Sequence, residues 1–165
     1  MAAEVPMLLI IWHSRTGAAR ALAEATLEGA LTEGAARLLP AGEAMPEDLL
    51  SACGYVFACP ENLGTMSGAM KEFFDRCYYP LLGQIEGRAY ATLIAAGSDG
   101  SGAERQLDRI VTGWRLRRIA EGLIVNLGAQ SPEEILAPKI MDLVSLQKCR
   151  DLGQSMAAGL TMGAF

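Results

Sequence analysis

The sequence predicts an α/β fold in which a parallel sheet carries helices on both faces. Short apolar runs alternate with longer helical patterns along the chain, in the order βαβαβαβαβα. The apolar runs are continuous rather than alternating, which is typical of strands buried on both faces. Strands and helices that alternate in this way form parallel strands joined by right-handed crossover connections.

The first half of the chain contains the clearest elements. Pro6–Trp12 is an apolar strand, and Ala18–Thr32, rich in Ala, Leu and Glu, is a helix that Gly34 is expected to end. A weakly signalled strand, a helical turn and a third strand follow, at Ala36–Leu39, Pro46–Ser51 and Tyr55–Cys59. Pro60 is expected to stop the third strand.

In the second half, the spacing of apolar residues marks the helices. One set shares a helix face that Pro80 is expected to close: Met66, Met70, Phe73, Phe74 and Cys77. A second set forms a stripe on the next helix: Leu107, Ile110, Val111 and Trp114. Tyr90–Ala96 and Leu123–Leu127 are the remaining strands. Ser131 begins a short helix, and a last helix is expected after Pro138, running through Met156.

Composition limits the classes of function. The chain has 165 residues, of which 51% are hydrophobic and 20% charged, so we expect one globular domain over residues 1–165. A net charge of −5 argues against nucleic acid as a partner. One histidine and four scattered cysteines do not make a zinc site. Without a signal peptide or a membrane span, we expect a cytoplasmic protein.

Three loops rich in glycine and hydroxyl residues follow three of the predicted strands. They are Ser14–Ala19, Pro60–Ser67 and Gly97–Gly102. The carboxyl ends of parallel strands meet at one edge of a sheet, and the ligands of open α/β sheets bind at that edge. We therefore expect the three loops to form one site.

The first of these loops is suited to a phosphate. It presents Ser14, Thr16 and backbone N–H groups at the start of a helix. Those N–H groups lack partners within the helix, and the helix dipole favours an anion. Taken alone, the loop is also compatible with a plain helix cap that binds nothing.

Other classes of phosphate-binding protein lack their signatures here. The P-loop motif G-x-x-x-x-G-K-[ST] is absent from the sequence, and the first loop has only Gly17 where a dinucleotide-binding fold has G-x-G-x-x-G. Trp12, His13 and Ser14 stand where a phosphotransfer receiver needs carboxylates for magnesium. No cysteine is followed six residues later by the arginine of a cysteine phosphatase. Once these classes are excluded, the remaining interpretation is a site that binds a phosphate group without a metal ion.

Two motifs carry a family resemblance. The first loop reads HSRTGAAR, and the second reads PENLGTMSGAMKEFFDR from Pro60 to Arg76. They resemble the phosphate loop and the P-x-x-x-G-x-M-x-G-x-[ML]-K-x-F-x-D-R segment of the flavodoxin-like family, in its branch of small FMN-dependent NAD(P)H oxidoreductases. The resemblance implies a flavodoxin-like three-layer sandwich with five parallel strands in the order 2-1-3-4-5.

The resemblance also implies the cofactor and its contacts. FMN would be held at its phosphate by the first loop: Ser14, Arg15, Thr16, Gly17, Ala18 and Ala19. The second loop would line the flavin ring: Pro60, Glu61, Asn62, Leu63, Gly64 and Thr65. The third loop would close the other side: Gly97, Ser98, Asp99 and Gly100. Neither a catalytic side chain nor a metal is implied, because the flavin itself carries the hydride.

The resemblance implies an oxidoreductase that passes electrons from NAD(P)H to a quinone or a similar small-molecule acceptor. Relatives of this kind are commonly dimers or tetramers, so a homodimer or homotetramer is expected. Two positions depart from the family pattern: Ala19 replaces a phosphate-binding Thr, and Leu63 replaces an aromatic residue. They keep open the alternative of a flavin-free regulatory or binding module on the same fold. A flavodoxin-type electron carrier without substrate turnover is a separate alternative.

Overall fold

The computed structural model describes residues 4–165, so residues 1–3 of the expected domain lie outside the described part. Strands and helices alternate along the chain as the sequence predicts. In chain order they are β1 (Met7–Trp12), α1 (Ala18–Ala30), β2 (Ala35–Pro40), α2 (Pro46–Leu50), β3 (Gly54–Asn62), β4 (Thr65–Met66), α3 (Gly68–Leu81), β5 (Ala89–Ala96), α4 (Ser101–Gly113), β6 (Arg117–Arg118), β7 (Leu123–Asn126), α5 (Pro132–Leu136) and α6 (Leu143–Met162).

The sheet has the predicted strand order. Its strands pair as β2-β1-β3-β5-β6, and β7 also pairs with β5. All of these pairs are parallel, whereas β4 pairs antiparallel with β3 in a hairpin. The expected order 2-1-3-4-5 is confirmed, with the difference that the fifth strand is divided into β6 and β7.

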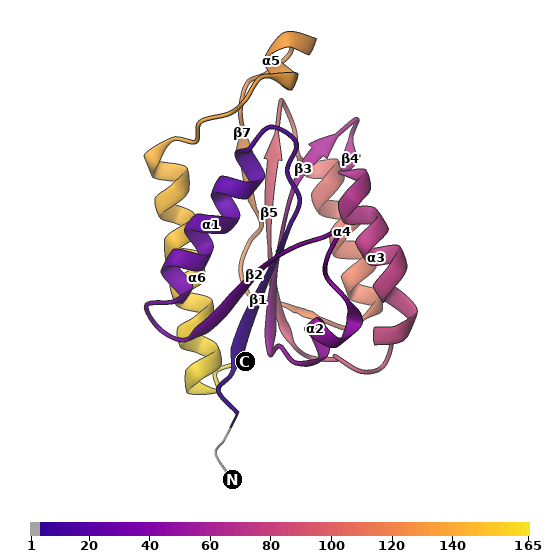
Figure 1. Cartoon of the computed structure of the whole chain (residues 1–165), viewed down its shortest axis with the longest axis vertical. Helices are drawn as coiled ribbons and strands as arrows, with labels where there is room; N and C mark the ends of the chain where they lie inside the picture. The colour runs from indigo at the N-terminus through magenta and orange to yellow at the C-terminus, as the bar shows by residue number, and fades with distance from the viewer. Residues whose placement is uncertain (1–3) are drawn as a thin grey trace.

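Helices cover both faces of this sheet (Figure 1). On one face α1 and α6 pack around a cluster that includes Leu8 and Ile10 of β1. On the other face α2, α3 and α4 contribute to a cluster that includes Leu9 and Ile11. All four side chains are fully buried. Successive residues of a strand point to opposite faces, so β1 has to be apolar throughout.

Two prolines do not end their elements where the sequence predicts. β3 continues through Pro60 to Asn62, so the prediction that it stops at Cys59 is wrong. β1 has already ended at Trp12, and a strand that has lost a neighbour tolerates a proline. Pro80 lies inside α3, which ends one residue later, at Leu81. A proline has no backbone N–H to donate to the preceding turn, so an end of the helix close to Pro80 is expected.

The last helix begins and ends later than predicted, at Leu143 and Met162. The carboxylate of Asp142 caps it by accepting the N–H of Ser145 at 2.8 Å.

Residues 128–142, between β7 and α6, are called the flap here. The flap carries α5, in which no residue is buried and which extends beyond the edge of the sheet where β5 ends (Figure 1). Within residues 4–165, no helix is both long and apolar enough to cross a membrane.

Candidate functional site

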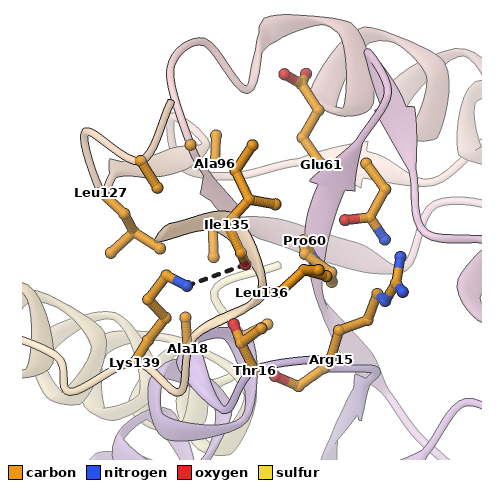
Figure 2. A pocket seen from close by; sticks show the side chains of 16 residues that line it. Arg15, Thr16, Ala18, Pro60, Glu61, Ala96, Leu127, Ile135, Leu136 and Lys139 are labelled. Atoms are coloured by element: carbon orange, nitrogen blue, oxygen red, sulfur yellow. Dashed lines mark hydrogen bonds between the residues drawn. The ribbon is translucent and has the colours of Figure 1, made fainter. Parts of the chain in front are cut away.

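The three predicted loops meet at the carboxyl edge of the sheet and surround a cavity. The inner cavity, of about 60 Å³, is lined by the first loop, by the ends of β3 and β5, and by the flap (Figure 2). A wider pocket of about 280 Å³ adjoins it, and Arg15, Glu61, Asn62, Gly97 and Ile135 line both. The two hollows therefore form one continuous site, narrow at α1 and wide between the second and third loops.

The narrow end is formed by the first loop, before α1. Gly17 has a φ of 96°, which a residue with a side chain rarely adopts, and the hydroxyl oxygen of Ser14 accepts its N–H at 3.0 Å. The N–H groups of Ala18 and Ala19 donate to no acceptor within residues 4–165, although these residues are only 3% and 1% exposed. Because buried amides are nearly always paired, this end of the cavity lacks an acceptor.

A tight hairpin forms the wide end of the site. Asn62 pairs with Thr65, and the two residues between them, Leu63 and Gly64, have φ values of 53° and 79°. Positive φ at both central residues is the geometry of a two-residue hairpin turn that favours Asn and Gly. Leu63 is therefore strained, and its side chain is fully exposed beside the wider pocket. Strain of this kind often marks a functional surface.

Glu61 joins the second loop to the third. Its carboxylate accepts the N–H of Gly100 at 2.9 Å and that of Ala103 at 3.0 Å, both at the start of α4. A carboxylate in this position satisfies two N–H groups and complements the helix dipole. A Cβ on Gly102 would lie 2.2 Å from the carbonyl oxygen of Gly64, so the two loops also touch through their backbones. Glu61 is thus a connector as well as a lining residue.

His13 connects the first loop to α3 beneath the site. Its Nδ1 lies 2.8 Å from the hydroxyl oxygen of Ser67, which is 1% exposed. Burial, and to a lesser extent the charge of Arg15, lowers the pKa of His13 below 6.5. Cys59 is fully buried nearby, and burial raises the pKa of its thiol to about 12, which keeps the thiol protonated.

Most of the site residues predicted from the sequence line the two hollows. The first loop contributes Ser14, Arg15, Thr16, Ala18 and Ala19, and the later loops contribute Pro60, Glu61, Asn62, Leu63, Gly64, Gly97 and Ser98.

The other predicted residues shape the loops. Gly17 caps α1, Gly100 caps α4, and the Thr65 hydroxyl donates to the carbonyl oxygens of Asn62 and Met66. Asp99 is exposed, and hydrogen bonds from the side chain and backbone of Ser101 lower its pKa.

The sequence interpretation missed the contribution of the flap. Ile135, Leu136 and Lys139 line the inner cavity, together with Leu127 and Ala129 just after β7. The Lys139 N–H donates to the carbonyl oxygen of Thr16 at 2.8 Å, which attaches the flap to the first loop. No sequence motif predicts this contact, because it joins positions more than a hundred residues apart. A lysine after the last strand is the only feature of the sequence that could have indicated it.

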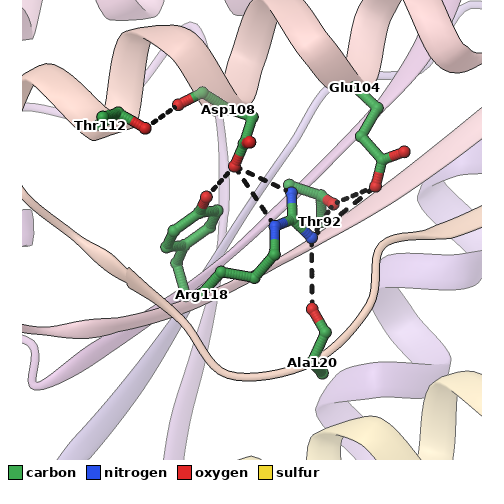
Figure 3. Close-up of polar contacts among 7 residues, drawn as sticks. Thr92, Glu104, Asp108, Thr112, Arg118 and Ala120 are labelled. Atoms are coloured by element: carbon green, nitrogen blue, oxygen red, sulfur yellow. Dashed lines mark hydrogen bonds and ion pairs between the residues drawn. The ribbon is translucent and has the colours of Figure 1, made fainter.

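A second polar cluster lies away from these loops, at the break between β6 and β7 (Figure 3). The Arg118 guanidinium donates to Asp108 at 3.2 Å and to the hydroxyl of Thr92 at 3.2 Å, and it lies over the ring of Tyr90. Burial, followed by the hydrogen bond to Asp108, raises the pKa of Tyr90 to about 12. Arg118 thus holds the divided edge strand against α4, which is a structural role.

Comparison with known proteins identifies the family. A family model described as NADPH-dependent FMN reductase matches residues 14–128, from the first loop to the start of the flap. The chain belongs to this family. The match spans all three loops, so the resemblance to the FMN oxidoreductase branch of the flavodoxin-like proteins is confirmed. FMN and NADPH are the cofactor and the electron donor that the family description names.

A curated relative and several solved structures agree with this assignment. A flavodoxin of Aquifex aeolicus is 37% identical over 107 residues, which are 64% of this chain but only 58% of that protein. An archaeal flavodoxin structure matches 93% of this chain and 98% of its own, with a TM-score of 0.75 and 15% identity. A flavodoxin, WrbA-like protein from Agrobacterium tumefaciens matches 95% and 98%, with a TM-score of 0.70 and 23% identity. These structural similarities establish the flavodoxin-like fold.

The residues present fit the phosphate of FMN. The buried, unpaired amides of Ala18 and Ala19 lack an acceptor, which a phosphate oxygen would supply, and Arg15 lines the same cavity. The wider pocket, between the hairpin and the third loop, is the roomier of the two hollows, at about 280 Å³ against about 60 Å³.

The substitution Glu61→Gln tests the connection between the loops. An amide offers one acceptor oxygen instead of two and removes the charge, so we expect the free energy of unfolding to fall by about 1–2 kcal/mol. Denaturant titration measures it. Glu43→Gln is the control, because Glu43 is exposed and its side chain makes no hydrogen bond or ion pair within residues 4–165, whereas its backbone N–H, which the substitution keeps, donates to Pro40. Equal stability of the two variants would contradict the proposed connection.

His13 predicts a pH dependence of stability. Its pKa is below 6.5 in the folded chain, so as the pH falls through 6.5 the unfolded chain binds a proton that the folded chain does not. Stability should therefore fall on acidification, and His13→Gln should lose less stability than the unchanged chain between about pH 7.5 and 5.5. Thermal unfolding across that range measures the difference. The same loss in both proteins would show that His13 does not titrate as described.

Proposed function

We propose that this protein is an FMN-dependent oxidoreductase that takes hydride from NADPH and passes electrons to a quinone or a similar small acceptor. The observation that supports it most directly is the pair of buried, unpaired amides of Ala18 and Ala19 in a cavity at the carboxyl edge of the sheet, inside the region that matches the family model. In this proposal the protein acts in the cytoplasm; its oligomeric state remains a prediction.

The first loop binds the phosphate in this proposal. The amides of Ala18 and Ala19 and the side chains of Ser14, Thr16 and Arg15 surround the narrow end of the site. Ala19 offers no hydroxyl, which costs about 0.5–1.5 kcal/mol of binding relative to a family member with Thr there. The guanidinium of Arg15 is able to offset that loss through a charge-assisted contact.

The second and third loops orient the ring and exclude water from one of its sides. Leu63, Gly64, Gly97 and Ser98 line the wider pocket, in which this proposal places the ring. Bound FMN supplies the hydride acceptance and electron transfer, so no side chain has to act as acid or base. Among the groups that line the site, the Glu61 carboxylate is already bonded to two N–H groups of α4.

A second candidate function is electron carriage without substrate turnover. It is favoured by the Aquifex relative, which is named a flavodoxin and is 37% identical over the matched region. A carrier docks on large partner proteins and needs a strongly acidic rim around its flavin. The charges near this site are mixed, with Arg15 and Lys139 beside Glu61 and Asp99. Mixed charges favour the oxidoreductase.

Steady-state turnover distinguishes the two candidates. The purified protein is loaded with FMN, freed of excess flavin, and mixed with NADPH and a soluble quinone. The proposal expects sustained NADPH oxidation at about 1 per second or faster, within the usual range for enzymes. Free FMN at the same concentration is the control for uncatalysed transfer. Bound FMN without turnover would favour the carrier, and the absence of FMN binding would favour a flavin-free module.

A further inference from the structure

The flap places one cation at the phosphate end of the site. Lys139 lines the inner cavity together with Ser14, Thr16, Ala18 and Ala19. One hydrogen bond fixes its backbone there, because its N–H donates to the Thr16 carbonyl oxygen at 2.8 Å. Its carbonyl oxygen lies close to Gly17, 3.8 Å from the position that a Cβ on that glycine would occupy. Met141, two residues later, is buried in the core beneath α1. The backbone of Lys139, from which the side chain extends, is therefore held next to the first loop.

The ammonium group of Lys139 has only neutral partners. It donates to the carbonyl oxygens of Glu134 at 2.7 Å, Ile135 at 3.1 Å and Ala137 at 2.5 Å, at the end of α5. Figure 2 shows the contact with Ile135. Within residues 4–165, neither Lys139 nor Arg15 has a carboxylate oxygen within 4.0 Å. A carbonyl compensates an ammonium charge less well than an anion does. Lys139 thus keeps its capacity to bind an anion.

A cation at this position would reduce the electrostatic repulsion between the chain and a bound phosphate. The chain carries a net charge of −5, and a phosphate monoester adds close to two negative charges near neutral pH. In Figure 2 Thr16 lies between Lys139 on one side and Arg15 on the other. A phosphate bound at the amides of Ala18 and Ala19 would therefore have a cation on each side.

We propose that Lys139 is a phosphate-binding residue, which exchanges its α5 carbonyl partners for the phosphate group of the flavin. This inference rests on the proposed function, since it takes FMN as the ligand. The four-carbon stem of lysine allows its ammonium to move while the backbone stays attached to Thr16. The flap then contributes to selection of the phosphorylated flavin over one without a phosphate.

Flavin binding to charge variants tests the proposal. FMN and riboflavin, which share a ring and differ by the phosphate, are each titrated into the unchanged chain, Lys139→Gln and Lys139→Arg, with flavin fluorescence as the readout. Lys139→Gln should raise the Kd for FMN about 10-fold or more, the usual effect of losing a hydrogen bond to a charged group. It should leave the Kd for riboflavin unchanged. Lys139→Arg, which keeps the charge, should retain most of the FMN affinity.

A matched control separates local binding from overall charge. Lys148 is exposed on α6 and has no ion pair within residues 4–165, so Lys148→Gln removes the same charge elsewhere. It should leave both Kd values unchanged. Because the contact is electrostatic, the fold-difference between the unchanged chain and Lys139→Gln should also shrink as salt is raised.

Three results would overturn the inference while leaving the proposed function in place, and each has a distinct meaning. If Lys139→Gln binds FMN like the unchanged chain, the lysine does not contact the phosphate. If it weakens FMN and riboflavin equally, the lysine acts by holding the flap in place. If the unchanged chain binds riboflavin as tightly as FMN, the phosphate pocket is not used, although the flavin function survives. Failure of the unchanged chain to bind either flavin would overturn the proposed function together with this inference.

Discussion

Burial of the parallel sheet on both faces is the constraint on which the rest of this structure depends. β1, β3 and β5 are apolar on both sides, so each connection between them has to cross a face as a helix. Every strand in the centre therefore ends at the same edge, and a loop leads from there into a helix. The packing of the core holds the three loops close together, and residues of the loops are therefore able to bind a ligand at that edge.

The site that results is made largely of backbone. Its narrow end offers the amides of Ala18 and Ala19, and its wide end offers a strained hairpin and a glycine loop. Glu61 connects the two sides of the wide end through two N–H groups of α4. Since that carboxylate is already paired with a helix N-terminus, its charge is partly compensated before any ligand binds. The arrangement suits a ligand with an anionic end and a flat, uncharged body.

Local patterns predicted most of the fold and much of the site. Strand order and the three loops followed from apolar runs, glycines and hydroxyl residues, all of which act over short stretches of chain. The pairing of Glu61 with α4 could not be predicted, because it needs β3 to run past Pro60 and reach residues about forty positions away. The position of Lys139 in the site could not be predicted for the same reason, since it also depends on a contact between distant parts of the chain. Its contact with Thr16 depends on the path of the flap, which contains no buried helix to signal it.

Amide hydrogen exchange with and without saturating FMN tests the central claim most directly, because the site is defined by backbone N–H groups. If the three loops bind FMN, the amides of residues 15–20, 61–66 and 97–103 should exchange more slowly with FMN than without it. Exchange should not change at residues 82–88, which connect α3 to β5 at the opposite edge of the sheet. Protection confined to other regions, or none at all under conditions where FMN is bound, would contradict the claim that the three loops form the flavin site.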